Sequence, residues 1–139
     1  MDVLIRKAKN EDLPGIYELL KCKELLDPDG KPCRKWWIKS FFKQVFLIAE
    51  SELDKKVVGF IIGEKASGNL GLIHLIAVKK EFRRKGIATL LLIKAEKELK
   101  KRNAKAILVY GYASRISKRF LRKSSYMKGS KTYEFLKFI

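Results

Sequence analysis

Histidine and cysteine are scarce in this 139-residue chain, which contains one histidine, His74, and two cysteines, Cys22 and Cys33. The cysteines are isolated and lack partner histidines at metal-ligand spacing, so the sequence predicts neither a zinc site nor a disulfide framework. No apolar run reaches the roughly 18 residues of a membrane span, and the charged N-terminus is unlike a secretory signal. We therefore expect a soluble, cytoplasmic protein with no metal site and no membrane partner.

Acidic residues are also few, since 15 Asp and Glu stand against 32 Lys and Arg and give a net charge of +17. Two explanations are open. A polyanionic partner such as RNA, DNA or a ribosomal surface would be attracted by a concentrated basic field. Host-wide lysine enrichment is the alternative, although that trend normally raises glutamate as well. The second is favoured because the cations are spread along the sequence without forming a block.

Length and a hydrophobic content of 47% indicate one domain, residues 1–139, with a core of normal size. Apolar runs bounded by turn residues predict strands, and apolar positions at helical spacing predict helices. The expected strands are residues 3–8, 46–50, 57–64, 72–78, 106–112 and 131–138, and the expected helices are residues 13–20, 36–45, 88–99 and 114–123. The strands at 46–50 and 57–64 should form an antiparallel hairpin. The strand at 106–112 should run parallel to the one at 72–78. The sheet is therefore expected to be mixed.

A basic turn around Gly86 joins the expected central strand to the helix that begins near Ala88, and from Arg83 it reads Arg-Arg-Lys-Gly-Ile-Ala. The first turn of a helix has backbone N–H groups without intrahelical partners and a partial positive charge. Gly86 has no Cβ, so a ligand can approach the backbone, and the flanking cations add full charges at the same point. The turn therefore predicts a phosphate-bearing ligand.

In its context of strand and helix, this hexapeptide resembles the R/Q-x-x-G-x-G/A signature of the GNAT superfamily of N-acetyltransferases. The resemblance implies an α/β fold with a mixed sheet of six or seven strands and about four helices. It also implies acetyl-CoA as the cofactor and direct transfer of its acetyl group to a primary amine. The positions that the family pattern assigns to the coenzyme are Ile76, Ala77, Val78, Arg83, Arg84, Lys85, Gly86, Ile87, Ala88, Thr89, Ser114 and Phe120. The backbone of residues 76–78 would pair with the pantetheine arm, and the start of the helix would hold the pyrophosphate.

The general acid of the family is harder to place in this chain. Family members often have an asparagine before the next helix and a tyrosine within it, whereas Ser114 and Leu121 take these positions here. Tyr112 is the candidate general acid, with Tyr110 and Tyr126 as alternatives. A thiol is a tolerable leaving group without strong acid help, so loss of the family tyrosine need not abolish transfer.

The candidate base is His74, because imidazole is the side chain that ionises near neutral pH and this residue lies on the central strand. Glu50 and Glu64 are further candidates. In the family pattern, the aromatic segment at residues 36–45 lies beside the acceptor, although packing of these rings in the core is the favoured interpretation. Its adjacent Trp36 and Trp37 cannot face the same way on a helix, so one of them is expected near the acceptor or an interface.

Two readings of the function follow from these residues. The first is an N-acetyltransferase whose acceptor is a small molecule, a peptide or an RNA-linked amine, with a homodimer as one allowed state. The alternative is a catalytically weak or inactive module of the same fold that binds acyl-CoA or associates with nucleic acid. The missing tyrosine and the large positive charge motivate the alternative.

Overall fold

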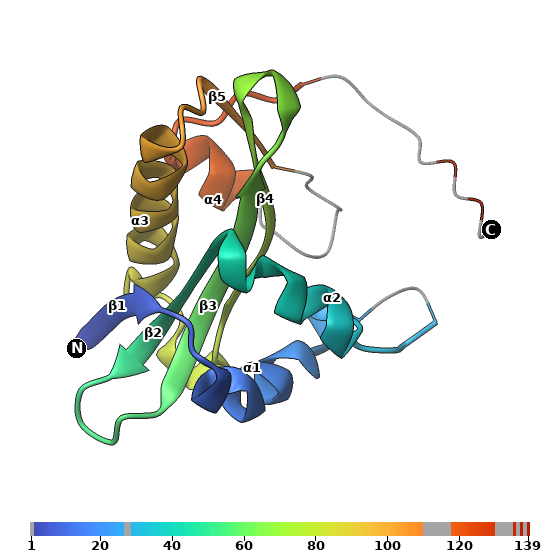
Figure 1. Cartoon of the computed structure of the whole chain (residues 1–139). Coiled ribbons are helices and arrows are strands. Elements are labelled where there is room, and N and C mark those ends of the chain that lie inside the picture. The colour runs from blue at the N-terminus through green and yellow to red at the C-terminus, as the bar shows by residue number, and fades with distance from the viewer. Residues whose placement is uncertain (1, 27–28, 110–117, 130–134, 136, 138) are drawn as a thin grey trace.

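The computed structural model describes residues 2–26, 29–109 and 118–129, together with residues 135, 137 and 139. A five-stranded sheet with the order β1-β2-β3-β4-β5 forms the centre of this part of the chain (Figure 1). Its strands are β1 (Val3–Lys7), β2 (Val45–Ser51), β3 (Val57–Lys65), β4 (Leu70–Val78) and β5 (Ala106–Val109). Neighbouring strands are antiparallel except β4 and β5, which are parallel. The predicted hairpin and the predicted mixed sheet are therefore confirmed.

The expected number of strands was six or seven, and the described residues contain five. The difference arises at the C-terminal end of the chain. Most of the strand predicted at residues 131–138 lies outside the described residues, and so do the last three residues of the strand predicted at 106–112.

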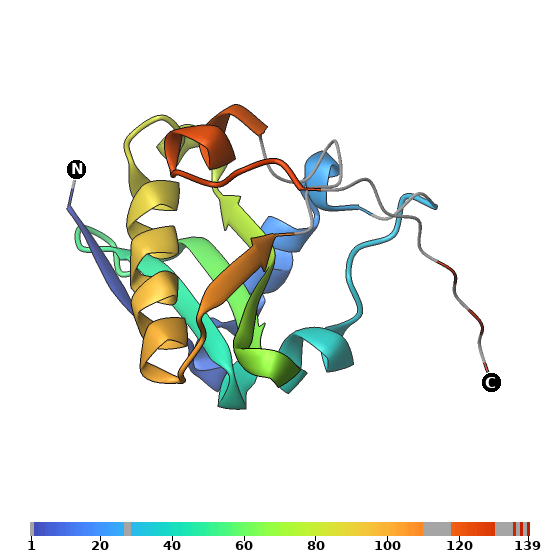
Figure 2. The same ribbon diagram turned by 90° about the horizontal axis from the view of Figure 1, so that it is seen from above.

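The α-helices of the described chain are α1 (Leu13–Leu20), α2 (Lys35–Lys39), α3 (Ile87–Lys101) and α4 (Lys118–Lys123). Helices α3 and α4 cover one face of the sheet, and α1 and α2 cover the other, which gives three layers (Figures 1 and 2). Short 3₁₀ segments lie between these elements, namely Asn10–Asp12, Lys23–Leu25, Ser40–Lys43, Ser67–Asn69 and Lys80–Phe82. The predicted helix at 114–123 is described only from Lys118 onward. The helix predicted at 36–45 is wrong in its second half, because α2 ends at Lys39, a 3₁₀ segment follows and Val45 begins β2.

Side-chain alternation along the strands divides the core into one cluster on each face of the sheet. In β2, for example, Val45 and Leu47 pack on the α3 side, whereas Phe46 and Ile48 pack on the α1 side. Residues 45–49 of this strand are all apolar because both of its faces are covered. Helix α3 buries Ile87, Leu91, Leu92, Ala95 and Leu99 against the first cluster. The apolar face predicted for this helix began at Ala88, which is only partly buried, and Ile87 takes its place in the core. Full burial of each leucine stabilises the fold by about 1.5–3 kcal/mol.

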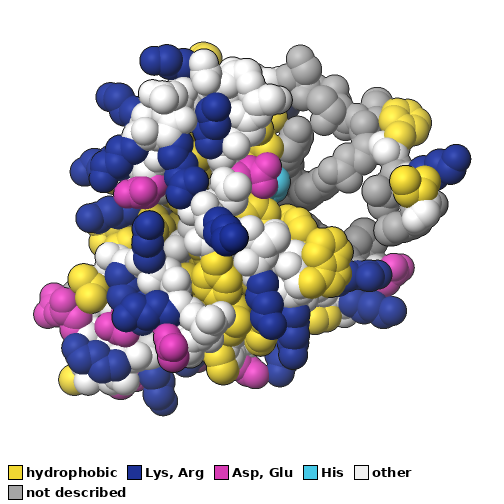
Figure 3. All heavy atoms as spheres, viewed as in Figure 1, with side chains coloured by type: hydrophobic (Ala, Val, Ile, Leu, Met, Phe, Trp, Pro, Cys, Tyr) yellow, Lys and Arg dark blue, Asp and Glu magenta, His cyan; other side chains and the backbone are white. Residues whose placement is uncertain are grey.

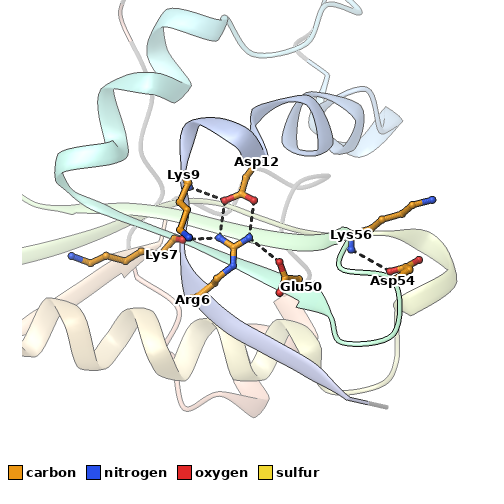
Figure 4. A network of polar contacts seen from close by, with 7 residues as sticks. All are labelled: Arg6, Lys7, Lys9, Asp12, Glu50, Asp54 and Lys56. Atoms are coloured by element: carbon orange, nitrogen blue, oxygen red, sulfur yellow. Dashed lines mark hydrogen bonds and ion pairs between the residues drawn. The ribbon is translucent and has the colours of Figure 1, made fainter.

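An ion-pair network centred on Arg6 fixes the start of α1 to the sheet (Figure 4). The two Nη atoms of Arg6 each donate to a carboxylate oxygen of Asp12 at 2.8 Å, and Nη2 also donates to Glu50 at 2.9 Å. The backbone N–H of Lys9 donates to Asp12 at 2.7 Å. Burial acts to raise the pKa of Asp12, but the hydrogen bonds from Arg6 and Lys9 outweigh it and hold that pKa below its ordinary value.

Candidate functional site

The loop of residues 79–86 joins the end of β4 to the start of α3. Its first N–H, that of Lys79, donates to the carbonyl of Val58 at 2.7 Å and so continues the pairing of β4 with β3. Further along, Nε of Arg83 donates to the carbonyl of Val78 at 2.9 Å, and Nη2 of Arg83 lies 3.7 Å from Sγ of Cys22, which follows α1. Arg83 therefore holds the loop against the end of the strand.

Gly86 is the N-cap of α3 and has a left-handed backbone, with φ of 81°. The first intrahelical bond runs from the N–H of Leu90 to the carbonyl of Gly86 at 3.0 Å, so the four preceding amides have no intrahelical acceptor. A Cβ built on Gly86 would meet no heavy atom within 4 Å. Arg84 and Lys85 are exposed beside this open space. The helix start therefore has room, free donors and positive charge for an anionic group.

In the described residues, β5 pairs over its whole length with the first part of β4, from Leu70 with Ala106 to Ile73 with Val109. Strand β4 continues to Val78, and on its other edge residues 76–78 pair with residues 59–61 of β3. The edge of residues 76–78 that faces away from β3 thus lies beyond the described ladder with β5. This edge runs directly into the loop at Gly86.

A β-bulge interrupts β4 at His74. Leu75 pairs with Ile62 and Ile73 pairs with Gly63, so His74 has no partner residue in β3. Bulges redirect side chains and are common next to active sites. Gly63 permits this one, because a Cβ at that position would lie 2.5 Å from the carbonyl oxygen of Leu72 in β4.

The bulge directs His74 toward the α2 side of the sheet, where it meets a carboxylate and two aromatic rings. Its Nε2 lies 3.3 Å from Oε2 of Glu64, an ion-pair contact whose alignment falls short of a hydrogen bond. The ring centroids of Trp37 and Phe41 lie 5.6 Å and 5.1 Å from that of His74. The His74 side chain is 21% exposed and that of Glu64 is 35% exposed, but the Nε2 atom of His74 is itself buried against Glu64. Trp36 points away and is 67% exposed, so Trp37 is the tryptophan beside the candidate base.

The predicted coenzyme residues therefore fall along one continuous path. Residues 76–78 lie on the part of β4 beyond its described ladder with β5, and residues 83–89 form the loop and the first turn of α3. Phe120 lies on α4, partly buried against the α3-side cluster. Tyr112, Tyr110 and Ser114 lie outside the described residues.

Of the remaining described candidates, Glu64 contacts His74, whereas Glu50 and Tyr126 are separated from it. Glu50 is bound to Arg6 in the network that anchors α1. The hydroxyl of Tyr126 donates to Glu96 at 2.8 Å, and burial together with this hydrogen bond raises the Tyr126 pKa. Tyr126 packs with the α3-side cluster, on the sheet face opposite the aromatic contacts of His74.

Sequence reasoning missed Phe41 as a neighbour of His74, and it missed the bulge. The available signal for the bulge was Gly63, because an isolated glycine within a strand pattern often marks such an irregularity. Within the described part of the chain, no three His, Cys, Asp or Glu side chains are arranged to hold a metal ion. No helix there is long and apolar enough to cross a membrane.

Comparison with known proteins agrees with this geometry. A model of the acetyltransferase (GNAT) family matches residues 5–125. A curated relative, an uncharacterized N-acetyltransferase from Methanocaldococcus jannaschii, is 36% identical over 90 residues, which are 65% of this chain and 54% of the relative. The chain thus spans about half the length of the curated relative that it matches.

Solved structures share the fold over nearly the whole chain. The PaiA N-acetyltransferase from Thermoplasma acidophilum, in complex with coenzyme A, is 22% identical with a TM-score of 0.72, covering 96% of this chain and 94% of that one. Glucosamine-6-phosphate N-acetyltransferase from Arabidopsis thaliana is 18% identical with a TM-score of 0.70, covering 99% of each chain. The α/β fold expected from the sequence is therefore confirmed.

Proposed function

This chain belongs to the acetyltransferase (GNAT) family, and on that basis we propose that it is an acetyl-CoA-dependent N-acetyltransferase that acts on a primary amine. One observation carries the proposal. The open space at Gly86 adjoins amides without intrahelical acceptors, and it continues from the edge of β4 that lies beyond the described ladder with β5. An anionic head followed by an extended arm fits this combination.

The coenzyme is proposed to lie along residues 76–89. The amides at the start of α3, with Arg84 and Lys85, would bind its diphosphate, and Arg83 would hold the loop in place through the carbonyl of Val78. The backbone of residues 76–78 would hydrogen-bond the pantetheine arm in the manner of an added strand. When bound, acetyl-CoA supplies the acetyl group as a thioester, an activated acyl donor.

His74 is proposed to accept the proton that the acceptor ammonium must lose before its nitrogen can attack. The bulge brings its imidazole toward the surface two residues before the proposed pantetheine contacts, and Glu64 would stabilise the protonated ring. Trp37 and Phe41 restrict the orientation of the ring and would contact the apolar part of an acceptor. Tyr112 stays our candidate for protonating the leaving thiolate, and Ser114 stays a candidate coenzyme contact.

Two measurements on the full chain test this function. Acetyl-CoA or CoA at about one hundred times its Kd should stabilise the fold by about 2.7 kcal/mol, which a thermal melt will detect. Thiol release should then rise when a panel of amines is added to protein and acetyl-CoA. ADP is the control, because it offers a diphosphate without the pantetheine arm.

The outcomes separate the two readings of the sequence. Stabilisation together with amine-dependent thiol release supports the enzyme. Stabilisation without thiol release for any amine supports the inactive acyl-CoA-binding module. The sequence feature that suggests this module is Leu121, which takes the position of the family tyrosine. If millimolar coenzyme gives no more stabilisation than ADP, the cofactor assignment is wrong.

A further inference from the structure

The positive charge is divided very unequally between the two halves of the chain. Residues 1–78 contain 13 Lys and Arg against 11 Asp and Glu, whereas residues 79–139 contain 19 against 4. Lysine enrichment of a whole proteome would act on both halves alike. The excess is therefore a property of the second half, and such asymmetry is typical of proteins that meet a polyanion.

The fold places the described part of this basic half on one side of the molecule. Residues 79–109 and 118–129 form the loop, α3, β5 and α4, and the segment after α4 is joined to α3 by the bond from Tyr126 to Glu96. Figure 3 shows Lys and Arg gathered at the left and upper edge of the view, on the side where α3 lies. Residues 118–129 contain five cations and no acid.

The outward face of α3 carries a row of lysines. Lys94, Lys97 and Lys101 are spaced by three and four residues, so they lie on the same side of the helix, and all three are exposed. Lys101 contacts Glu98 at 3.5 Å, whereas Lys94 and Lys97 form no ion pair with a described residue. Lys97 lies about 15 Å along the helix from its N-terminus, so this row is remote from the proposed diphosphate site.

The side chains of this region can recognise mainly the charge of a ligand. Its described aromatic residues, Phe82, Phe120 and Tyr126, are all partly buried, so the region has no exposed ring on which an unpaired base could stack. From Leu90 to Arg102, α3 has no hydroxyl or amide side chain of the kind that reads a ribose 2′-hydroxyl. On α3, these features favour a duplex over a single strand and provide no contact that would select ribose.

We propose that the face of α3 and α4 binds the phosphate backbone of duplex DNA without reading its sequence. Duplex DNA carries one negative charge for about every 1.7 Å of its axis, so several lysines along one helix contact phosphates together. The contact lies on the opposite side of the sheet from the aromatic contacts of His74. The lysine row on α3 is also remote from the proposed diphosphate site, and the variants tested below leave the coenzyme candidate Phe120 on α4 unchanged, so either assignment can fail without the other.

The test compares two triple variants that remove the same charge. The first is Lys94→Gln, Lys97→Gln and Lys101→Gln on α3. The matched control is Lys7→Gln, Lys55→Gln and Lys56→Gln, three exposed positions in β1 and the β2–β3 turn. Binding of a labelled DNA duplex of about 20 base pairs is followed by fluorescence anisotropy from about 50 to 300 mM KCl. Circular dichroism and acetyl-CoA affinity serve to verify that both variants are folded.

The α3 variant should reduce the slope of log Kd against log salt by about two to three, since each lost phosphate contact removes about 0.9. The control should change the slope by less than about one half. Absence of DNA binding at low salt, or equal losses in the two variants, would overturn the proposal. Tighter binding of an RNA duplex, poly-glutamate or phosphatidylserine vesicles at matched charge would also overturn it, and would identify that partner instead.

Discussion

Nε2 of His74 and Oε2 of Glu64 lie 3.3 Å apart on adjacent strands, and the bulge at His74 is what brings them together. Without the bulge, the strict alternation of β4 would place His74 and Leu75 on opposite faces of the sheet. With it, His74 reaches Trp37 and Phe41, and Leu75 packs into the same α1-side cluster. The histidine is therefore presented at the site by backbone geometry in β4.

Replacing this histidine tests its role as base. His74→Gln should lower kcat by about 10²-fold or more with little change in the KM for acetyl-CoA, because general-base catalysis contributes 10²–10⁴-fold. The deficit should shrink as the pH approaches about 10, where an alkylamine acceptor loses its own proton. Glu64→Gln should cause a smaller loss, and the exposed Glu18→Gln is the matched control. A loss that does not vary with pH would assign His74 a structural role.

The glycine at the start of α3 offers a matched pair of substitutions. Gly86→Ala places a methyl group in the open space proposed for the diphosphate and strains a backbone with φ of 81°. Gly68→Ala has a similar φ of 68° and an equally open position, in the turn before β4. Both variants should lose about 1–2 kcal/mol of stability. Only Gly86→Ala should raise the Kd for CoA, by tenfold or more in calorimetry, and an unchanged Kd would refute the proposed diphosphate site.

The Arg6 network predicts a pH-dependent contribution to stability. Because the folded-state pKa of Asp12 is lowered, its contribution is present above the ordinary carboxyl pKa of about 3.9 and is lost as the pH falls through the lower folded value. Asp12→Asn should cost on the order of 3 kcal/mol near neutral pH, since it leaves Arg6 partly unpaired. Urea unfolding should show this difference shrinking below about pH 4. Asp2→Asn is the control, and an equal effect there would exclude the network as the cause.

The bulge itself is testable at Gly63. Gly63→Ala forces a methyl group against the carbonyl of Leu72, so we expect a loss of about 1–3 kcal/mol and a displaced His74. Acetyl transfer should fall more than CoA affinity, because the proposed coenzyme contacts begin at Ile76. Gly129→Ala, whose added methyl meets no heavy atom within 4 Å, is the control. Full activity in Gly63→Ala would show that the bulge does not position the base.

Most of the fold could be predicted because local patterns report burial on both faces of the sheet. The spacing of Leu91, Leu92, Ala95 and Leu99 predicted the buried stripe of α3, and these residues are buried. Strand limits agree to within about two residues where turn residues flank an apolar run, as in β2 and β3.

The candidate site could be predicted only in part, because the turn at Gly86 depends on local sequence whereas the surroundings of His74 depend on tertiary packing. The turn at Gly86 is local and is visible in six consecutive residues. The surroundings of His74 depend on a one-residue register shift, for which Gly63 is a weak local signal, and on the packing of Trp37 from another layer, which has no local signature. The basic face likewise could be counted along the chain, but its position required α3 and α4 to pack on the same side.

The unequal charge of the two halves also makes the molecule an electric dipole. A charged surface acts on such a molecule as a torque before contact, within a screening distance of about 10 Å at 0.1 M salt. Near a polyanion the chain will rotate until α3 and α4 lead the approach. The α1 and α2 layer, with His74 beside Trp37, then lies on the side away from the polyanion.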